Sequence, residues 1–379
     1  MGGVINGADR LHAATFLRGK RLGLIASPSG VTQDLRLTLD ALHAQFTLTA
    51  LYAPEHGARG DAEAGEWVAS YTDARTGLPV YSLYGSSKKP TADMLADIDL
   101  LVLDVQDIGC RYYTFISTMR LCMEACAENG KAFAVLDRPN PINGTTVEGN
   151  LVQKDFESFV GCAPIPVRHA LTLGEMAQLF NAEYSINCEL HILPVENWQR
   201  ELYADQTNQP WVNPSPNMPC LDAALLYPGT CLFEGTNLSE GRGTTKPFEL
   251  FGAPWLDATD LAEKLNARNP AGLRFRPVYF KPTFSKHAGQ LCGGVQAHII
   301  DRRALQPLAA GLVMLDTVRE ISGAHFAWIP PFMGGDGRNF IDLLCGSDTL
   351  RTKGTAAFVQ ECAAGVAAFA PIREKYLLY

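Results

Sequence analysis

Residues 21–136 alternate between short, continuously apolar runs and segments with helical spacing. The apolar runs lie at 21–26, 46–52, 99–105 and 131–136. A run that is apolar at every position is typical of a strand buried on both faces, and strands separated by helices are typical of a parallel sheet with helices on both sides. We therefore predict an α/β fold for the first half of the chain.

The segments between these runs have the periodicity of helices. Residues 35–46 repeat a leucine or phenylalanine every three or four positions, and residues 114–130 form a second periodic segment that ends at a glycine. A shorter helix at 94–98 and a shorter strand at 78–83 complete the predicted pattern.

The length of 379 residues corresponds to about two domains. Four prolines exclude a helix or an inner strand from residues 210–219. We take this stretch as the approach to a domain boundary and divide the chain into 1–223 and 224–379. The second part is expected to be smaller and α+β, with strands at 278–280 and 294–300 and helices at 258–267, 305–321 and 355–368.

Composition excludes several classes of protein. Hydrophobic residues make up 47% of the chain, which rules out global disorder, and the net charge of -8 disfavours nucleic acid and anionic membrane surfaces as partners. No stretch approaches the ~20 apolar residues of a membrane span. No secretory signal is visible, and the ten scattered cysteines are typical of reduced thiols. We expect a cytoplasmic protein, or a periplasmic or secreted one if a leader has been removed.

Polar clusters follow three of the predicted strands, at the carboxyl ends where parallel sheets bind ligands. The first cluster is residues 54–61, after the second strand. There Glu55 could serve as a general acid or base, with its pKa set by burial and by Arg59. The structural alternative is a turn in which Glu55 pairs with Arg59.

The second cluster, residues 104–114, follows the strand at 99–105, which is the clearest buried strand. Polar groups there are costly unless they are hydrogen-bonded, and Gln106 and Arg111 are suited to bind hydroxyl and carboxylate groups. The alternative is that an aspartate caps the next helix, a role that suits Asp107 while Asp104 faces the cleft.

Two further clusters are predicted to be loops. Residues 137–141 carry two prolines that rigidify the loop around Asn140, which suits either a ligand contact or a plain tight turn. Residues 233–244 combine glycines with Glu234 and Arg242, and they form either a binding site or a solvated surface loop.

Several common signatures are absent from the sequence. It contains no Gly-x-Ser-x-Gly elbow, no P-loop, no Gly-x-Gly-x-x-Gly after the first strand and no His-Glu-x-x-His. The eight histidines are dispersed, and only His56 lies in a polar cluster. These absences count against an α/β-hydrolase triad, a P-loop nucleotidase, a dinucleotide-dependent oxidoreductase and a zinc site.

The motifs themselves resemble those of the exo-β-N-acetylmuramidase family NamZ. The matching segments occur in order and cover the chain from about residue 20 to its end. They are 54–60 (PEHGARG), 104–114 (DVQDIGCRYYT), 137–144 (DRPNPING), 234–244 (EGTNLSEGRGT), 280–286 (FKPTFSK) and 294–296 (GVQ).

The resemblance implies a Rossmann-like N-terminal domain, a smaller C-terminal auxiliary domain and an active-site cleft between them. It implies a glycosidase of cell-wall recycling that releases N-acetylmuramic acid from the non-reducing end of peptidoglycan-derived saccharides or muropeptides, with no cofactor. We expect a monomer or a small homo-oligomer.

Glycoside hydrolysis normally needs two carboxyl groups that flank the bond, and their separation decides between retention and inversion. Glu55 is our candidate for the acid or base, and His56 could tune its pKa or bind a sugar hydroxyl. Glu234, Asp104 and Asp107 are alternatives for the second group. Assistance by the substrate's own N-acetyl group is a third mechanism.

Muramic acid differs from glucosamine by a lactyl carboxylate, whose recognition calls for a cation. The remaining candidates for substrate binding are Arg59, Gln106, Arg111, Tyr113, Asp137, Arg138, Asn140, Asn237 and Arg242. Among them, one of the arginines is expected to bind the lactyl group. A non-catalytic protein that binds peptidoglycan or amino sugars on the same scaffold is the main alternative, and a hydrolase of another ester or amide bond is a weaker one.

Overall fold

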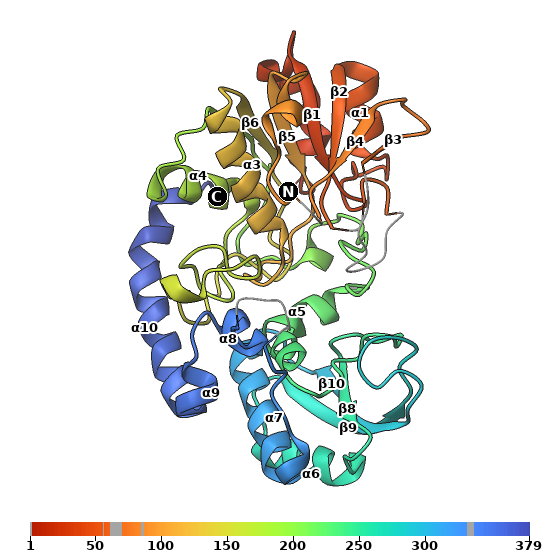
Figure 1. The fold of residues 1–379 in the computed structure, drawn as a ribbon, viewed down its shortest axis with the longest axis vertical. Coiled ribbons are helices and arrows are strands. Elements are labelled where there is room, and N and C mark those ends of the chain that lie inside the picture. The colour runs from red at the N-terminus through yellow and green to blue at the C-terminus, as the bar shows by residue number, and fades with distance from the viewer. Residues whose placement is uncertain (1, 56, 61–69, 85–86, 332–336) are drawn as a thin grey trace.

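The computed structural model describes residues 2–55, 57–60, 70–84, 87–331 and 337–379, which form two lobes stacked along the long axis (Figure 1). The first lobe is built on a seven-stranded sheet with the order β3-β4-β2-β1-β5-β6-β7, in which only β3 is antiparallel to its neighbour. Its strands are β1 (Arg21–Ala26), β2 (Thr47–Ala53), β3 (Tyr71–Thr72), β4 (Pro79–Ser82), β5 (Leu100–Asp104), β6 (Ala132–Leu136) and β7 (Leu190–Leu193).

Both faces of this sheet are covered because alternate residues of each central strand enter two separate cores. On β5, Leu100 and Val102 pack in the core that contains α1 (Thr38–Gln45), whereas Leu101 and Leu103 pack in the core that contains α3 (Phe115–Glu128). The further helices of this lobe are α2 (Ala92–Leu95) and α4 (Leu173–Glu183). The predicted α/β fold with a parallel sheet is confirmed.

Helix α1 is shorter than its apolar periodicity predicts. Leu35 has a left-handed φ of 64° and is 59% exposed, so it lies before the helix, which begins at Thr38.

The second lobe contains a three-stranded antiparallel sheet with the order β8-β10-β9, formed by β8 (Leu250–Ala253), β9 (Leu273–Phe280) and β10 (Cys292–Ile299). Helix α6 packs on β9 and β10, and α7 packs on α5 and α6. The helices of this lobe are α5 (Leu221–Thr230), α6 (Ala258–Arg268), α7 (Pro307–Ser322), α8 (Phe340–Cys345) and α9 (Thr349–Lys353). It is the smaller α+β part that was expected.

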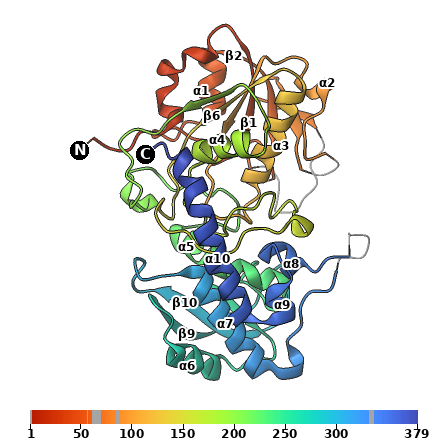
Figure 2. The same cartoon turned by 90° about the vertical axis from the view of Figure 1, so that its left-hand side faces the viewer.

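Helix α10 (Thr355–Arg373) runs back from the second lobe along the first, so that the C-terminus lies on the first lobe (Figure 2). Gly365 lets it approach the backbone closely, since a Cβ atom there would lie 2.8 Å from the Cα of Asn150. With the turn that follows it, this is the one described helix long and apolar enough to cross a membrane, a feature that the sequence analysis did not anticipate. Length and composition alone are weak evidence for a span, and Phe358, Gly365 and Phe369 are the buried residues of this helix.

Candidate active site

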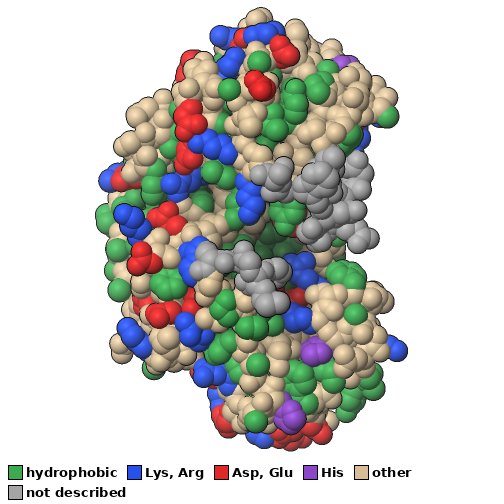
Figure 3. Space-filling view, viewed as in Figure 1, with side chains coloured by type: hydrophobic (Ala, Val, Ile, Leu, Met, Phe, Trp, Pro, Cys, Tyr) green, Lys and Arg blue, Asp and Glu red, His purple; other side chains and the backbone are tan. Residues whose placement is uncertain are grey.

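A cavity of about 540 Å³ lies between the two lobes and is lined by residues of both. Glu55, Tyr84 and Tyr113 come from the first lobe, and Glu234 and Arg242 come from the second. The space-filling view shows a hollow between the lobes with charged side chains at its edge (Figure 3).

Glu55 reaches this cavity because it follows β2, at the carboxyl edge of the parallel sheet. The hydroxyl of Thr114 donates to its Oε2 at 3.4 Å. Burial, the charge of Glu55 and a hydrogen bond with Glu55 together raise the pKa of Tyr84 to about 12. Tyr84 therefore keeps its proton at neutral pH and can donate it to Glu55 in a hydrogen bond.

Glu234 lies on a short 3-10 helix, η5 (Cys231–Gly235), on the opposite side of the cavity. Arg242 Nη2 donates to its Oε1 at 2.8 Å, and Arg242 Nε lies 3.5 Å from Oε1 of the buried Glu240. Burial on its own would lower the pKa of Arg242, but Glu234 and Glu240 outweigh it and hold that pKa above its ordinary value. The guanidinium thus fixes the orientation of Glu234.

The turn that carries Arg242 requires glycine. Gly243 has a φ of 77°, and a Cβ atom there would lie 2.6 Å from the carbonyl oxygen of Phe284. The backbone NH of Thr283 donates to the Gly243 carbonyl at 2.9 Å, which ties this turn to the FKPTFSK segment.

Aromatic rings form one wall of the cavity. Tyr113 and Tyr227 meet edge to face with their ring centres 6.1 Å apart, and Phe115 lies 5.1 Å from Tyr113. Burial raises the pKa of Tyr113 above its ordinary value. An aromatic wall beside two carboxylates gives a sugar ring both an apolar surface and polar partners.

Asp104 and Arg138 form a buried ion pair outside the lining of this cavity. Arg138 Nε and Nη2 donate to the two carboxylate oxygens of Asp104 at 2.6 and 2.8 Å, and Nη2 also donates to the carbonyl of Val31. Asp107 is also buried. It accepts from the backbone NH of Gly109 at 2.6 Å and lies 3.7 Å from His169 Nε2.

The other arginines named from the sequence also lie apart from the lining. Arg59 donates to Asp73 at 2.6 Å and 3.0 Å and to Asp40 at 3.2 Å. Arg111 is fully buried and donates to four backbone carbonyls, two of which, those of Leu344 and Cys345, belong to the second lobe.

Three further residues that the sequence suggested for substrate binding form hydrogen bonds to the backbone of neighbouring segments. Asp137 accepts hydrogen bonds from Thr172 and from the backbone NH of Gly174 at the start of α4. Asn140 bridges the backbone of Leu171 and Ile142, and Asn237 bridges the backbone of His325 and Ala327. His56 lies outside the residues that the structure describes.

The comparisons with known proteins cover both lobes. The description "Exo-beta-N-acetylmuramidase NamZ, N-terminal" matches residues 22–222, and "Exo-beta-N-acetylmuramidase NamZ, C-terminal" matches residues 225–379. The chain belongs to the NamZ family. The peptidoglycan beta-N-acetylmuramidase NamZ of Bacillus subtilis (strain 168) is 46% identical over 370 residues, which is 96% of this chain and 88% of that protein.

Two solved structures from Bacteroides fragilis, both described as DUF1343 family proteins, share the fold. One is 38% identical with a TM-score of 0.90 and covers 99% of each chain. The other is 31% identical with a TM-score of 0.76, over 100% of this chain and 99% of that one.

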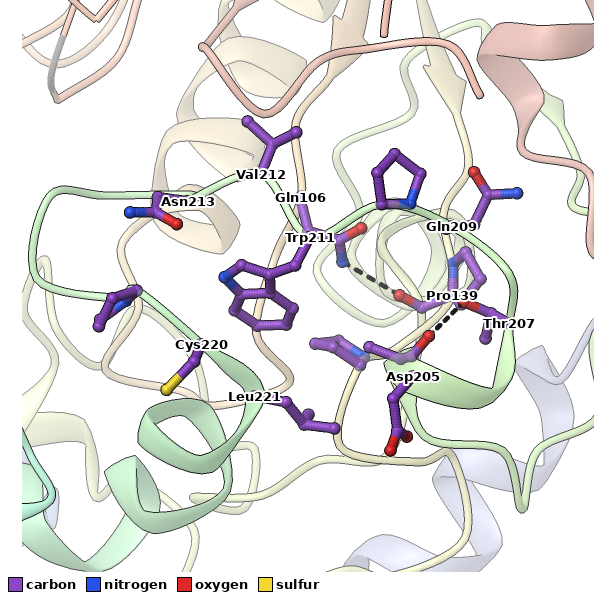
Figure 4. A pocket seen from close by; sticks show the side chains of 14 residues that line it. Gln106, Pro139, Asp205, Thr207, Gln209, Trp211, Val212, Asn213, Cys220 and Leu221 are labelled. Atoms are coloured by element: carbon purple, nitrogen blue, oxygen red, sulfur yellow. Dashed lines mark hydrogen bonds between the residues drawn. The ribbon is translucent and has the colours of Figure 1, made fainter. Parts of the chain in front are cut away.

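A second cavity of about 440 Å³ lies beside the proline-rich segment and contains Gln106 and Trp211 (Figure 4). Asp205 is the one carboxylate among the described residues that line it, and Arg302 donates to both of its oxygens. This cavity therefore offers one carboxylate, whereas the cavity between the lobes offers two, Glu55 and Glu234.

The sequence analysis missed several residues of the cavity between the lobes, namely Tyr84, Lys88, Ser158, Phe159, Tyr227 and Arg338. They belong to none of the NamZ motifs quoted above, and no local pattern singles them out. Within the described ranges, no group of three His, Cys, Asp or Glu side chains is placed to hold a metal ion.

Proposed function

We propose that this chain is an exo-β-N-acetylmuramidase that releases N-acetylmuramic acid from the non-reducing end of peptidoglycan-derived saccharides or muropeptides. The observation that carries the proposal is the cavity into which the two lobes of a NamZ family member each bring a glutamate, Glu55 and Glu234. The similarity to a relative named as a peptidoglycan β-N-acetylmuramidase supports the choice of substrate.

We assign Glu55 as the general acid or base. Among the described residues it has no cationic partner, whereas Glu234 is bound to Arg242. A general acid must hold a proton before the bond breaks, and a nearby cation works against that. Glu234 then acts as the second carboxylate, either on the anomeric carbon or water, or on the acetamide if the substrate's N-acetyl group assists.

The other residues suggested by the sequence fall into two groups, those at the cavity and those buried in contacts within the protein. We propose that Arg242 and Tyr113 act at the cavity, through Glu234 and through the aromatic wall respectively. Asp104, Asp107 and Arg138 are proposed to support the loops at the carboxyl edge of the sheet, since all three are buried in contacts within the protein.

We further propose that the catalytic unit spans 1–223 and the auxiliary unit 224–379, with the second completing the site. A cytoplasmic location is proposed with it, which the ten free cysteines suit. Cell fractionation tests the location, and recovery of the protein outside the cytoplasm would contradict it.

The test of the function uses a chromogenic β-N-acetylmuraminide with the matching β-N-acetylglucosaminide beside it. Release from the muraminide alone is expected. With peptidoglycan saccharides, mass spectrometry should show free N-acetylmuramic acid as the first small product. Binding of the muraminide without release would instead favour a sugar-binding protein.

A further inference from the structure

The cavity between the lobes holds cations, but most are already committed to groups of the protein. Arg242 is bound to Glu234 and lies against Glu240. Arg338 donates to the backbone carbonyls of Asp155 and Glu157. Lys88 is different because no carboxylate of the described chain pairs with it, although it lines the same cavity as Glu55 and Glu234.

Lys88 has a defined place on the cavity wall. Its Nζ lies 4.1 Å from the ring centre of Phe159, which also lines the cavity. Such a contact holds an ammonium group without neutralising it. The Phe159 carbonyl accepts from Ser117 at 2.7 Å, so the ring rests on a backbone that α3 holds.

A second polar group without a partner belongs to Ser158, the residue that precedes Phe159 in the chain. The hydroxyl of Ser158 is buried and has no hydrogen-bond partner among the described residues, and Ser158 belongs to the lining of the cavity. A buried hydroxyl without a partner is costly, and a rotation of the Ser158 side chain toward the cavity would let it donate to a ligand group. A lysine ammonium and a serine hydroxyl together match a carboxylate.

We propose that Lys88, with Ser158 of the same cavity lining, binds the free lactyl carboxylate of N-acetylmuramic acid and so makes the enzyme selective for muraminides whose lactyl group carries no peptide. The inference rests on the proposed function and goes beyond it by naming the residues that bind the lactyl carboxylate. Arg59, Arg111 and Arg138, which the sequence suggested for this role, donate to groups of the protein instead.

The test compares Lys88→Met with Lys89→Met. Methionine keeps an unbranched side chain over Phe159 and removes the charge. Lys89 is the matched control because its Nζ pairs with Glu124 and Glu128, at 3.5 and 2.7 Å, and it does not line the cavity. The substrates are a chromogenic muraminide with a free lactyl group and the same compound with that group converted to its amide.

Lys88→Met should raise KM for the acidic muraminide about tenfold, as expected for a charge-assisted hydrogen bond, and leave kcat and the amide substrate nearly unchanged. Lys88→Arg should recover most of the loss, and Ser158→Ala should show a smaller rise in KM. An unchanged KM in Lys88→Met, or an equal rise in Lys89→Met, would overturn the proposal.

Titration calorimetry with free N-acetylmuramic acid separates this proposal from the proposed function, because it needs no turnover. Weaker binding to Lys88→Met than to the parent supports the lactyl contact even if neither protein hydrolyses a muraminide, an outcome that would defeat the hydrolase assignment alone. Equal binding by both would defeat the lactyl contact.

Discussion

At the scale of single residues, burial decides what an arginine can do. Arg138 is 5% exposed and Asp104 1% exposed, and the two are joined by paired hydrogen bonds. A charge removed from water at that depth needs a partner inside the protein, so Arg138 has little left to offer a ligand. Arg242 is also well enclosed, but its partner Glu234 faces the cavity.

Replacing Arg138 by methionine should therefore act on stability. It leaves Asp104 buried without its partner, which costs about 3–5 kcal/mol of unfolding free energy. Urea denaturation measures the loss, and the double variant Arg138→Met, Asp104→Leu should regain much of it. If Arg138→Met is as stable as the parent but has a raised KM, Arg138 belongs to the substrate site after all.

At the scale of elements, the sequence predicts best the strands that are buried along their whole length. The four central strands were foreseen as apolar runs, and helices that correspond to α6, α7 and α10 were also predicted. The strands β3, β7 and β8 have only two to four residues, too few to show a period. Helix α5 was missed because it follows the prolines directly and is apolar on nearly all sides, so no stripe marks it.

Helices α5 and α7 cross at a pair of glycines, Gly229 and Gly311. A Cβ atom on Gly311 would lie 2.4 Å from the Cα of Gly229, which is backbone and cannot move aside. Alanine usually stabilises a helix interior by about 1 kcal/mol over glycine, but overpacking costs about 1–3 kcal/mol.

We expect Gly311→Ala to lower the unfolding free energy by up to about 2 kcal/mol, which is the overpacking cost less the gain in helix propensity. Ala309→Gly, at an exposed position of the same helix, is the control and should cost about 1 kcal/mol by helix propensity alone. Both are measured by chemical denaturation. A gain in stability for Gly311→Ala would show that the helices can move apart.

The start of α4 predicts a pH dependence. Burial raises the pKa of Asp137 from 3.8 to about 6, against the hydrogen bonds from Thr172, Gly174 and Tyr379 that lower it. The folded protein therefore favours the protonated form. The stability that protonated Asp137 contributes is fully present below about pH 4 and is lost as the pH rises through about 6. The unfolding free energy falls by about 3 kcal/mol in all.

Asp137→Asn cannot titrate at this position. The stability of this variant relative to the parent should rise by about that amount between pH 4 and 7. Unfolding free energies of both proteins at several pH values across this range give the difference. A difference that stays constant with pH would contradict the raised pKa.

At the scale of the whole molecule, the site depends on a contact between lobes that sequence patterns do not contain. The motifs located the loops, and the carboxyl-end rule placed Glu55 at the right edge of the sheet. They did not show that Glu234 would lie across the cavity from Glu55, or that Asp104 would form an ion pair with Arg138. They also did not show that Lys88 and Tyr227 would line the cavity. The position of Glu234 and Tyr227 opposite Glu55 follows from how the second lobe packs on the first, whereas the Asp104–Arg138 pair forms within the first lobe.

We propose that Glu55 protonates the leaving group in the cavity between the lobes. The most direct test measures kcat of the parent and Glu55→Gln on two muraminides, one with a nitrophenyl leaving group and one with a sugar. A general acid matters most when the leaving group is poor. We expect a loss of about 100-fold or more on the sugar aglycone and a clearly smaller loss on the nitrophenyl compound. Equal losses on both, or full activity in Glu55→Gln, would contradict it.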